Sequence, residues 1–442
     1  MGKFSYKKLL LSLGLISCSF IVSQNIPAIA QAGQKVIAPK TYYWLDASNG
    51  GKGFFGAMAN IPFMKSGDNN AWGNAYDGMA GKHADIAVLN KDFPNQINAT
   101  QNIPNNMGLS KSISLLPITN QKQTSKSEYG QDTQIPPDYK LKDFKMSFYW
   151  GCGAKAKAPP KVFQIKNGVM TDTALGMKSR NDPNQNQSYA EGASKWPNLK
   201  DKRNIGGGAN MLGNHSVTGA NLPATLAFAI NDSQNFMGDL GLSSSGDKSG
   251  IISLKWNALN NAKAYYFNAI GFKDGEMVMW SASDVPDMGS GLMNYLSPSK
   301  LSQFLSEKAI LPPSQTKCDI PSGIFANMQM VMVNGIGYGD ETTIIYPARP
   351  SDPRVTWVQE WSARFRNKSV DHLMVGMPSM GDAMRGETNA PSMTPEEKAK
   401  LECEKEKSKN ASVGKTIGGA FGGGLGSALG GALGKSKTKC PN

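Results

Sequence analysis

The chain has 442 residues, of which 48 are glycine and 25 are proline, and 9% of its residues are aromatic. A chain of this length can hold two or three domains, and this composition favours a turn-rich β protein over a helical one. The formal net charge is +13, but no basic helix, arginine cluster or RNA-recognition motif accompanies it, so nucleic-acid binding is not expected.

The first 32 residues have the organisation of a signal peptide. Three lysines precede an apolar run over residues 9–22, and Ala30-Gln31-Ala32 then forms an A-x-A cleavage motif. The apolar run is too short for a comfortable transmembrane helix. Cleavage after Ala32 would make Gly33 the first residue and would place the protein in the periplasm, in the outer membrane or at the cell surface of a Gram-negative bacterium.

A second interpretation of the same segment stays open. Leu15-Ile16-Ser17-Cys18 has the pattern of a lipobox, in which Cys18 would be lipidated and would become the first residue. Residues 19–22 remain apolar, whereas lipoproteins usually turn polar after the lipidated cysteine. Simple cleavage is therefore the preferred interpretation, and both interpretations predict export.

Export would place the remaining four cysteines in an oxidising compartment. They are Cys152, Cys318, Cys403 and Cys440. An even number of cysteines in such a compartment predicts two disulfides, although four cysteines allow three pairings. We expect Cys152 to pair with Cys318, and Cys403 to pair with Cys440. No C-x-x-C pair occurs in the sequence, so zinc binding and thioredoxin-like chemistry are not expected.

Residues 33–230 carry repeated strand signals and predict an N-terminal β domain with an antiparallel, sandwich-like fold. The segment FKMSFYW alternates cleanly, so that four large side chains share one face: Phe144, Met146, Phe148 and Trp150. Further strands are expected at residues 41–48, 83–90, 160–165 and 224–230. The stretches 65–82 and 171–210 are rich in Asn, Gly and Ser, and they are expected to be loops.

Residues 234–350 carry a sharper signature. Their segment GIISLKWNALNNAKAYYFNAIGFKDGEMVMWSAS, over residues 250–283, resembles a fibronectin type III-like domain. On that resemblance, Leu254 and Trp256 point to one face and fill the space between two antiparallel sheets. The Asp-Gly pair within residues 272–275 favours a tight hairpin. The resemblance implies a fold and no particular function.

A helix is expected to interrupt this second block. Residues 297–313 follow helical spacing, Ser297 can cap the first turn, and Pro298 suits the position after it. Strands at residues 327–334 and 342–347 are expected to close the domain. The predicted fold is therefore mainly β, with two antiparallel sandwich-like domains, the second of which carries an inserted helix.

Residues 351–393 are methionine-rich and poor in bulky aliphatic side chains, and they are interpreted as a linker. Thioether and imidazole groups suit a soft ion such as Cu(I), and the segment holds one histidine followed closely by four methionines: His372, Met374, Met377, Met380 and Met384. This set is a weak candidate for a metal site. The plain linker is the preferred interpretation, so no cofactor is predicted.

The sequence carries no familiar catalytic motif. It contains no H-E-x-x-H, no G-x-S-x-G and no phosphate-binding glycine loop, and its only histidines are His83, His215 and His372. Cys152 lies between two glycines and could act as a nucleophile with a distant histidine. A disulfide with Cys318 is preferred, and no catalytic residue is predicted.

Residues 394–442 are expected to form a charged helix and then a helical glycine-zipper tail. Six glycines recur every four residues beside a row of large apolar residues, at Gly414, Gly418, Gly422, Gly426, Gly430 and Gly434. Glycines beside a ridge of large side chains suit close helix packing in lipid, and the pattern resembles the glycine-zipper segments of bacterial outer-membrane lipoproteins. Residues 411–434 are therefore expected to contact a membrane or another copy of the chain; a disordered tail is the alternative.

The pairing of Cys403 with Cys440 requires this tail to fold back on itself. One continuous helix would hold the two cysteines about 54 Å apart, at roughly 1.5 Å per residue, whereas a disulfide needs α-carbons within about 7 Å. A hairpin near residues 422–424 and a single membrane crossing therefore exclude each other. The hairpin is preferred because it uses both cysteines in one compartment.

Four stretches make residues 33–380 resemble a group of uncharacterised secreted proteins of proteobacteria: FYWGCGAKAK, MVMWSAS, LPPSQTKCDIP and YPARPSDP. This resemblance implies export and supplies no activity. We therefore expect an exported cell-envelope protein with a non-catalytic structural or binding role, whose partner is a membrane, another copy, an envelope polymer or another envelope protein. The alternative is a hydrolase acting on an envelope polymer, which would need a deep cleft lined by His215 or by acidic residues.

Overall fold

The computed structural model describes residues 33–51, 70–117, 143–183 and 191–376, with Gly168 and Leu175 excepted. The segments predicted as a signal peptide, a charged helix and a glycine-zipper tail lie outside these residues. The described chain is mainly β, as predicted. Its strands are β1 (Val36–Ile37), β2 (Thr41–Gly50), β3 (Gly81–Asn90), β4 (Ala99–Asn102), β5 (Ser112–Pro117), β6 (Phe144–Trp150), β7 (Lys161–Lys166), β8 (Val169–Asp172), β9 (Ser194–Trp196), β10 (Gly213–Gly219), β11 (Ala227–Ile230), β12 (Ser243–Ser245), β13 (Ile252–Lys255), β14 (Ala264–Lys273), β15 (Glu276–Ser281), β16 (Lys317–Ile320), β17 (Met330–Tyr346), β18 (Trp357–Val358) and β19 (Trp361–Met374).

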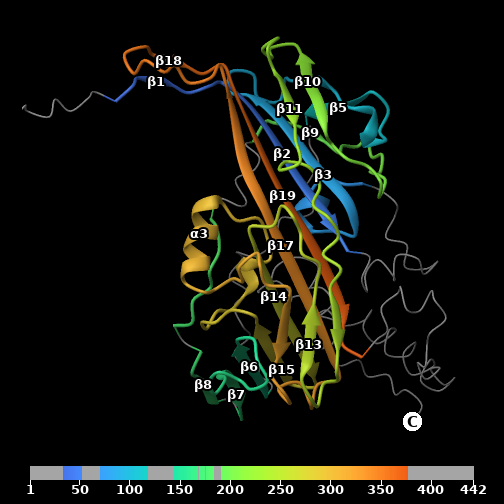
Figure 1. The fold of residues 1–442 in the computed structure, drawn as a ribbon, viewed down its shortest axis with the longest axis vertical. Coiled ribbons are helices and arrows are strands. Elements are labelled where there is room, and N and C mark those ends of the chain that lie inside the picture. Colours follow the sequence, from blue (N-terminus) through green and yellow to red (C-terminus); the bar gives the residue numbers. More distant parts are fainter. Residues whose placement is uncertain are drawn as a thin grey trace, which may run out of the picture.

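Fourteen of these strands form one large sheet, in the order β11-β10-β4-β5-β9-β3-β2-β19-β17-β14-β15-β6-β7-β8 (Figure 1). Strand pairs formed within either predicted block are antiparallel, as expected. The large sheet has two parallel pairs: β15 with β6 joins the second block to the first, and β19 with β2 joins the segment predicted as a linker to the first block. The large sheet is therefore mixed and continuous. The prediction of two separate domains built only from antiparallel sheets was wrong in this respect. Alternation along a strand identifies its buried face and says nothing about its neighbour.

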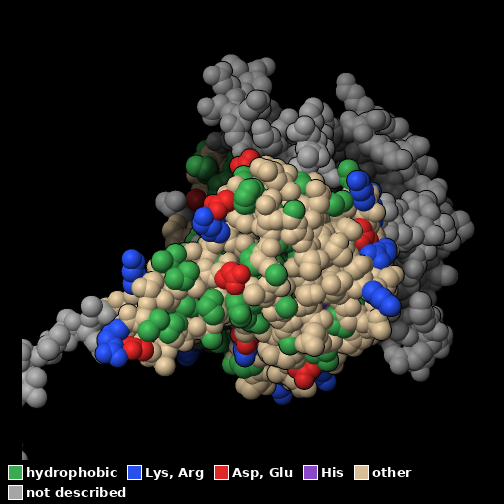
Figure 2. Space-filling model, turned by 90° about the horizontal axis from the view of Figure 1, so that it is seen from above, with side chains coloured by type: hydrophobic (Ala, Val, Ile, Leu, Met, Phe, Trp, Pro, Cys, Tyr) green, Lys and Arg blue, Asp and Glu red, His purple; other side chains and the backbone are tan. Residues whose placement is uncertain are grey.

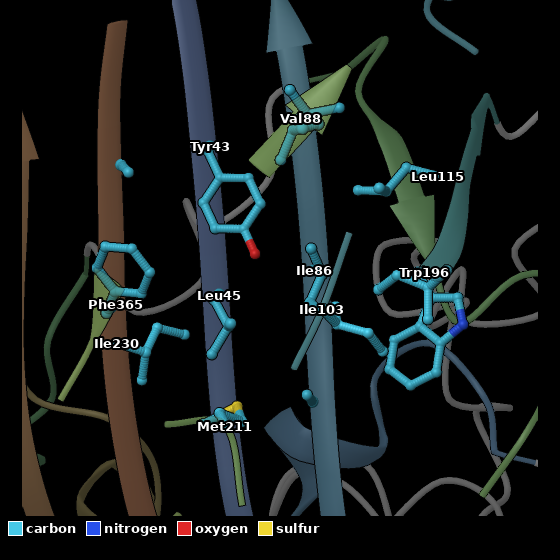
Figure 3. Close-up of a cluster of buried hydrophobic side chains, with 14 of the residues drawn as sticks. Tyr43, Leu45, Ile86, Val88, Ile103, Leu115, Trp196, Met211, Ile230 and Phe365 are labelled. Carbon is cyan, nitrogen blue, oxygen red and sulfur yellow. The ribbon is translucent and has the colours of Figure 1, made fainter. Parts of the chain in front are cut away.

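The first eight strands of this order curl around a single hydrophobic core. Side chains from β11 and β19, which lie seven places apart in the order, meet there: the ring of Phe228 lies 5.0 Å from that of Phe365 and 4.8 Å from that of Tyr43. Figure 3 shows this core, with residues of β2, β3, β5, β9 and β19 pointing inward. The indole N–H of Trp361 donates to the carbonyl of Thr225 at 3.1 Å and closes the gap between the two ends.

The other half of the large sheet is covered by a small sheet of three strands, β12-β13-β16. Leu254 is fully buried, Trp256 is 5% exposed, and the ring of Trp256 lies 4.1 Å from that of Phe267 on β14. The prediction that Leu254 and Trp256 fill the space between two sheets is confirmed. The predicted hairpin is also confirmed, because Lys273 pairs with Glu276 across a two-residue turn in which Gly275 has φ +71°.

The disulfide between Cys152 and Cys318 is present, with α-carbons 5.1 Å apart. Cys152 follows β6 and Cys318 lies in β16, so the bond ties the end of a strand of the large sheet to the small sheet. The sequence prediction for this pair is confirmed, and neither sulfur is a free thiol. Cys403 and Cys440 lie outside the described residues.

Several predicted boundaries differ from the structure. The helix is α3 (Pro298–Ser306), shorter than predicted, and the strands expected at 327–334 and 342–347 are one strand, β17. Residues 361–374, assigned to a linker, form β19 in the middle of the large sheet. The short helix α2 (Asn74–Asp77) and strand β9 lie in stretches predicted as loops, and the turns η1 (Asn105–Met107) and η2 (Ser290–Leu292) complete the helical elements.

A β-bulge bends the two longest strands where β17 pairs with β19. Three steps along β17, from Tyr338 to Glu341, match two steps along β19. Asn367 fills the irregularity, because its side-chain oxygen accepts from the backbone N–H of Asp340 at 3.0 Å. A Cβ on Gly339 would lie 1.7 Å from that oxygen, so only glycine fits there.

Candidate interaction surface

The two shortest strands form an arm that projects from the body. We define the arm as residues 33–38 and 346–360, in which β1 pairs in parallel with β18. Figure 1 shows it extending sideways from the end of the molecule at which β17 ends and β19 begins. Among the described residues, β1 and β18 form a two-stranded sheet of their own, separate from the large sheet.

Large apolar side chains are concentrated on this arm. Val36, Ile37, Val355 and Val358 are 48%, 45%, 49% and 54% exposed, and Tyr346 at the base is 41% exposed. These five are among only twelve large hydrophobic side chains that are exposed in the described chain. Figure 2 shows hydrophobic side chains gathered along the arm, next to charged ones. Apolar groups gathered in this way typically mark an interaction site.

Hydrogen bonds hold the arm in a defined shape. The side-chain amide of Gln34 donates to the carbonyl of Val355 at 2.9 Å, and its oxygen accepts from Arg349 Nε at 2.7 Å. The indole N–H of Trp357 donates to the carbonyl of Pro347 at 2.9 Å, and the guanidinium of Arg349 lies 5.7 Å from the Trp357 ring. The exposed valine and isoleucine side chains are therefore presented in a fixed arrangement.

A second unusual feature is a row of four charged side chains across the centre of the large sheet, of which three are buried and Glu341 is partly buried. Asp85, Asp46, Arg366 and Glu341 are direct neighbours on β3, β2, β19 and β17. Arg366 donates to both oxygens of Asp46, at 2.7 Å and 2.6 Å. The carboxylate of Asp85 accepts from the backbone N–H groups of Gly73 at 3.0 Å and Tyr76 at 3.2 Å, at the start of α2.

Lys368 lies next to this row and is 1% exposed. Its ammonium donates to the carbonyl of Tyr76 at 2.6 Å and to the side-chain oxygen of Asn294 at 3.0 Å. The ring of Tyr295 lies 4.5 Å from this ammonium and 4.3 Å from the guanidinium of Arg366. We name Asp46, Asp85, Arg366, Lys368 and Tyr295 the buried charge cluster.

Burial perturbs the titration of this cluster. It raises the pKa of Asp85 to about 7, and the neighbouring carboxylate of Asp46 adds to the effect. It lowers the pKa of Lys368 to about 7, with a further contribution from the positive charge of Arg366. Perturbed pKa values in one place are typical of functional sites, but structural ion-pair networks produce them as well. Here the charged groups bond to residues of α2 and to the 294–295 segment, so the cluster fastens these segments onto the sheet.

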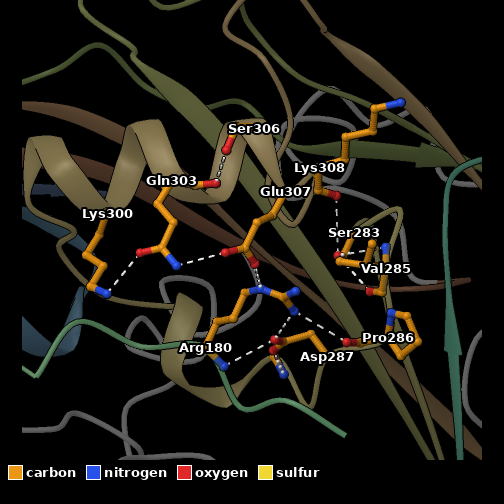
Figure 4. A network of polar contacts seen from close by, with 11 residues as sticks. Arg180, Ser283, Val285, Pro286, Asp287, Lys300, Gln303, Ser306, Glu307 and Lys308 are labelled. Atoms are coloured by element: carbon orange, nitrogen blue, oxygen red, sulfur yellow. Dashed lines mark hydrogen bonds and ion pairs between the residues drawn. The ribbon is translucent and has the colours of Figure 1, made fainter.

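A further polar network holds the segment around Arg180 against the end of α3 (Figure 4). The guanidinium of Arg180 donates to Asp287 at 2.8 Å and to Glu307 at 2.6 Å. Gln303 on α3 donates to the second oxygen of Glu307 at 2.8 Å. A depression of about 280 Å³ adjoins Arg180 and is lined also by Met177, Lys178 and Pro286. Because the guanidinium of Arg180 is committed to two carboxylates, this network holds the fold together.

The weak metal candidate is only partly described. His372 and Met374 lie two residues apart on β19, and Nδ1 of His372 lies 2.8 Å from the side-chain oxygen of Asn334. Burial lowers the pKa of His372 to about 4. Met377, Met380 and Met384 lie outside the described residues, and within those residues no three His, Cys, Asp or Glu side chains gather as metal ligands do. Copper binding therefore stays an untested alternative.

His215, which the hydrolase alternative would place in a cleft, lies in the core. It is 1% exposed and its ring stacks on that of Phe228 at 5.7 Å. Its Nε2 donates to the carbonyl of Met211 at 2.8 Å, and its Nδ1 accepts from Gln101 at 3.2 Å. Burial lowers the pKa of His215, in keeping with a neutral ring. His215 is therefore a core residue with satisfied hydrogen bonds.

Sequence reasoning missed both the arm and the buried charge cluster. The arm combines the first residues of the predicted mature chain with a proline-rich stretch that was divided between a domain and a linker. Its signal was the group Val355, Trp357 and Val358 directly after the prolines. The buried charge cluster had no local signal, because Asp46 lies 320 residues from its partner Arg366 in the chain.

Comparisons of the chain with protein-family models, with curated proteins and with solved structures found no match. In the described part of the chain, no helix has both the length and the apolar character that crossing a bilayer demands. The candidate site therefore rests on the geometry of the arm.

Proposed function

We propose that the chain is an exported cell-envelope protein with a non-catalytic binding or structural role, and that its partner docks on the arm. The observation that carries this proposal is the set of exposed apolar side chains on the arm, which Gln34 and Trp357 hold in a fixed shape. The signal-peptide pattern of residues 1–32 supports export. The disulfide between Cys152 and Cys318 is consistent with an oxidising compartment.

For the second half of the body we propose a fibronectin type III-like sandwich over residues 243–375. Its support is the strand pairing: β12-β13-β16 lie opposite β15-β14-β17-β19, and every pair within each set is antiparallel. The helix α3 is inserted between β15 and β16. A sandwich of this kind is a scaffold that serves many binding proteins and carries no activity by itself.

We further propose that the glycine zipper at residues 411–434 ties the protein to a membrane or to other copies. The arm and the tail would then supply two separate contacts, one with a partner and one with the envelope. This part of the proposal rests on the sequence pattern of the tail.

Fractionation of the native host tests the proposal. We would compare the full chain, a chain lacking residues 411–442 and a chain with Ile37→Asp and Val358→Asp. We expect the full chain in the envelope fraction, with Gly33 or a lipidated Cys18 as its first residue. Removal of the tail should lower the amount of protein in that fraction. Recovery of an uncleaved chain in the cytoplasm would contradict the proposal.

A further inference from the structure

We infer that the arm binds an extended segment of another protein by strand addition, and that this segment carries acidic side chains between its apolar ones. The inference rests on the function proposed above and specifies the chemistry of the partner.

The backbone of the arm offers two open strand edges. Trp357 donates to the carbonyl of Lys35 at 2.8 Å, and Gln359 donates to the carbonyl of Ile37 at 3.0 Å. In a parallel pair with this pattern, the backbone groups of Val36 and Val358 point away from the partner strand. No third strand of the described chain covers either edge. An open edge bearing apolar side chains is a template for an added strand.

The side chains present apolar surface on both faces of the arm. Val36 pairs with Trp357 and Ile37 pairs with Val358, so each pair points to a different face. Val358 and Ile37 are 54% and 45% exposed on their face. A strand added at either edge would extend both faces and would place its alternate side chains beside these residues.

The open edges favour a protein partner over a lipid surface. Insertion of the arm into hydrocarbon would carry the unpaired N–H and C=O groups of Val36 and Val358 into a medium without hydrogen-bond partners. Each such group costs several kcal/mol there, which is why open sheet edges are not found facing lipid tails. An added peptide strand would satisfy the same groups.

The charge of the arm favours an acidic partner over a second copy. The arm carries three basic side chains, Lys35, Arg349 and Arg354, against two acids, Asp352 and Glu360, and Asp352 is paired with Arg354 at 2.8 Å. The arm is therefore net positive, which favours an acidic segment over a second arm of the same charge.

Fluorescence anisotropy of labelled peptides tests the inference on the full mature chain. The probe is a fluorescein-labelled peptide of sequence TVEVEVT. Its matched controls are TVKVKVT, with the opposite charge, and TVEPEVT, in which proline removes a backbone donor. We expect the acidic peptide to bind at least tenfold more tightly than either control.

Two protein variants complete the experiment. Ile37→Asp with Val358→Asp should abolish binding of TVEVEVT. Val169→Asp with Met170→Asp should leave it unchanged, because that apolar pair is even more exposed, at 67% and 66%, but lies on β8. Equal affinity for all three peptides, no binding at about 1 mM, or binding that survives in the arm variant would overturn the inference. Arm-dependent binding to phosphatidylglycerol vesicles without peptide binding would overturn it too, while leaving the proposed function in place.

Discussion

The arm and the buried charge cluster both reverse the usual distribution of side chains, in opposite directions. In the cluster, charged groups lie inside the protein: Asp46 is fully buried and Lys368 is 1% exposed. On the arm, aliphatic groups lie outside: Val358 is 54% exposed. Each arrangement costs free energy unless a partner compensates it.

The two regions differ in where that partner is. The charges of the cluster bond to neighbouring strands, to α2 and to residues 294–295, all of which belong to the same chain. The apolar side chains of the arm face outward from a two-stranded sheet that the rest of the described chain does not cover. The difference teaches that buried charge here serves stability, and that the exposed arm is the better place to look for binding.

The largest expected effect comes from breaking the cluster at its centre. Arg366→Ala would leave the carboxylate of Asp46 buried without its bidentate partner, which typically destabilises a protein by about 3–5 kcal/mol. Urea unfolding followed by fluorescence would measure it. Arg354→Ala is the matched control, because its ion pair with Asp352 is 88% exposed on the arginine side and should matter by less than about 1 kcal/mol. Equal losses of unfolding free energy in both variants would contradict the structural role assigned to the buried charge cluster.

Removal of the disulfide should have the next largest effect. Replacement of Cys152 and Cys318 by serine opens a loop closed over a sequence separation of 166 residues. The free energy of unfolding should fall by about 2–5 kcal/mol. Addition of a reducing agent should lower the melting temperature of the wild type by a similar amount and should leave that of the double variant unchanged. A wild-type melting curve that is unchanged by the reducing agent would contradict the presence of the disulfide.

A smaller, pH-dependent effect is expected at Asp85. Burial raises its pKa in the folded protein to about 7, whereas an unfolded chain releases this proton near pH 4. Stability contributed by this group is therefore full below about pH 4 and falls as the pH rises toward 7. Asp85→Asn removes the titration and keeps an acceptor for α2. Urea midpoints between pH 4 and 8 should fall more steeply for the wild type than for the variant; parallel curves would show that Asp85 does not titrate in this range.

The smallest effect on stability is expected at the arm. Val358→Asp adds a charge to a side chain that is 54% exposed, so the free energy of unfolding should change by less than about 0.5 kcal/mol. Differential scanning fluorimetry would compare the melting temperature of this variant with that of Arg366→Ala. We expect the smaller change for the arm variant and the larger one for the cluster variant. A large loss of stability at Val358 would mean that the arm belongs to the core fold.

The parts of the fold that the sequence predicted well are those specified by local patterns. Leu254 and Trp256 lie two residues apart and so share one face, and Asp274-Gly275 favours a turn by itself. The central strands of residues 243–375 were therefore predictable from residues adjacent in the sequence. The presence of disulfides followed from the cysteine count and the expected compartment, and the pairing of Cys152 with Cys318 followed from their places after strand or turn signals. These features needed no knowledge of distant strands.

The parts that it missed depend on contacts between distant segments. β19 was interpreted as part of a linker because residues 351–393 are methionine-rich and poor in bulky aliphatic side chains. Its buried Arg366 depends on Asp46, which lies on β2 and is distant in the chain. The arm required residues 36–37 to pair with residues 357–358, and no local pattern marks such a pair. The candidate site was therefore not predictable from periodicity, although exposed valines after a proline-rich stretch gave a partial signal.

Site-specific photo-crosslinking in the native host tests the central claim most directly. A benzophenone side chain would replace Val358 on the arm and, in a parallel strain, Val169 on β8, which is 67% exposed. The account predicts one discrete crosslinked product at position 358 that disappears with Ile37→Asp, and none at position 169. The same products at both positions, or no product at position 358, would contradict the assignment of the arm as the interaction surface.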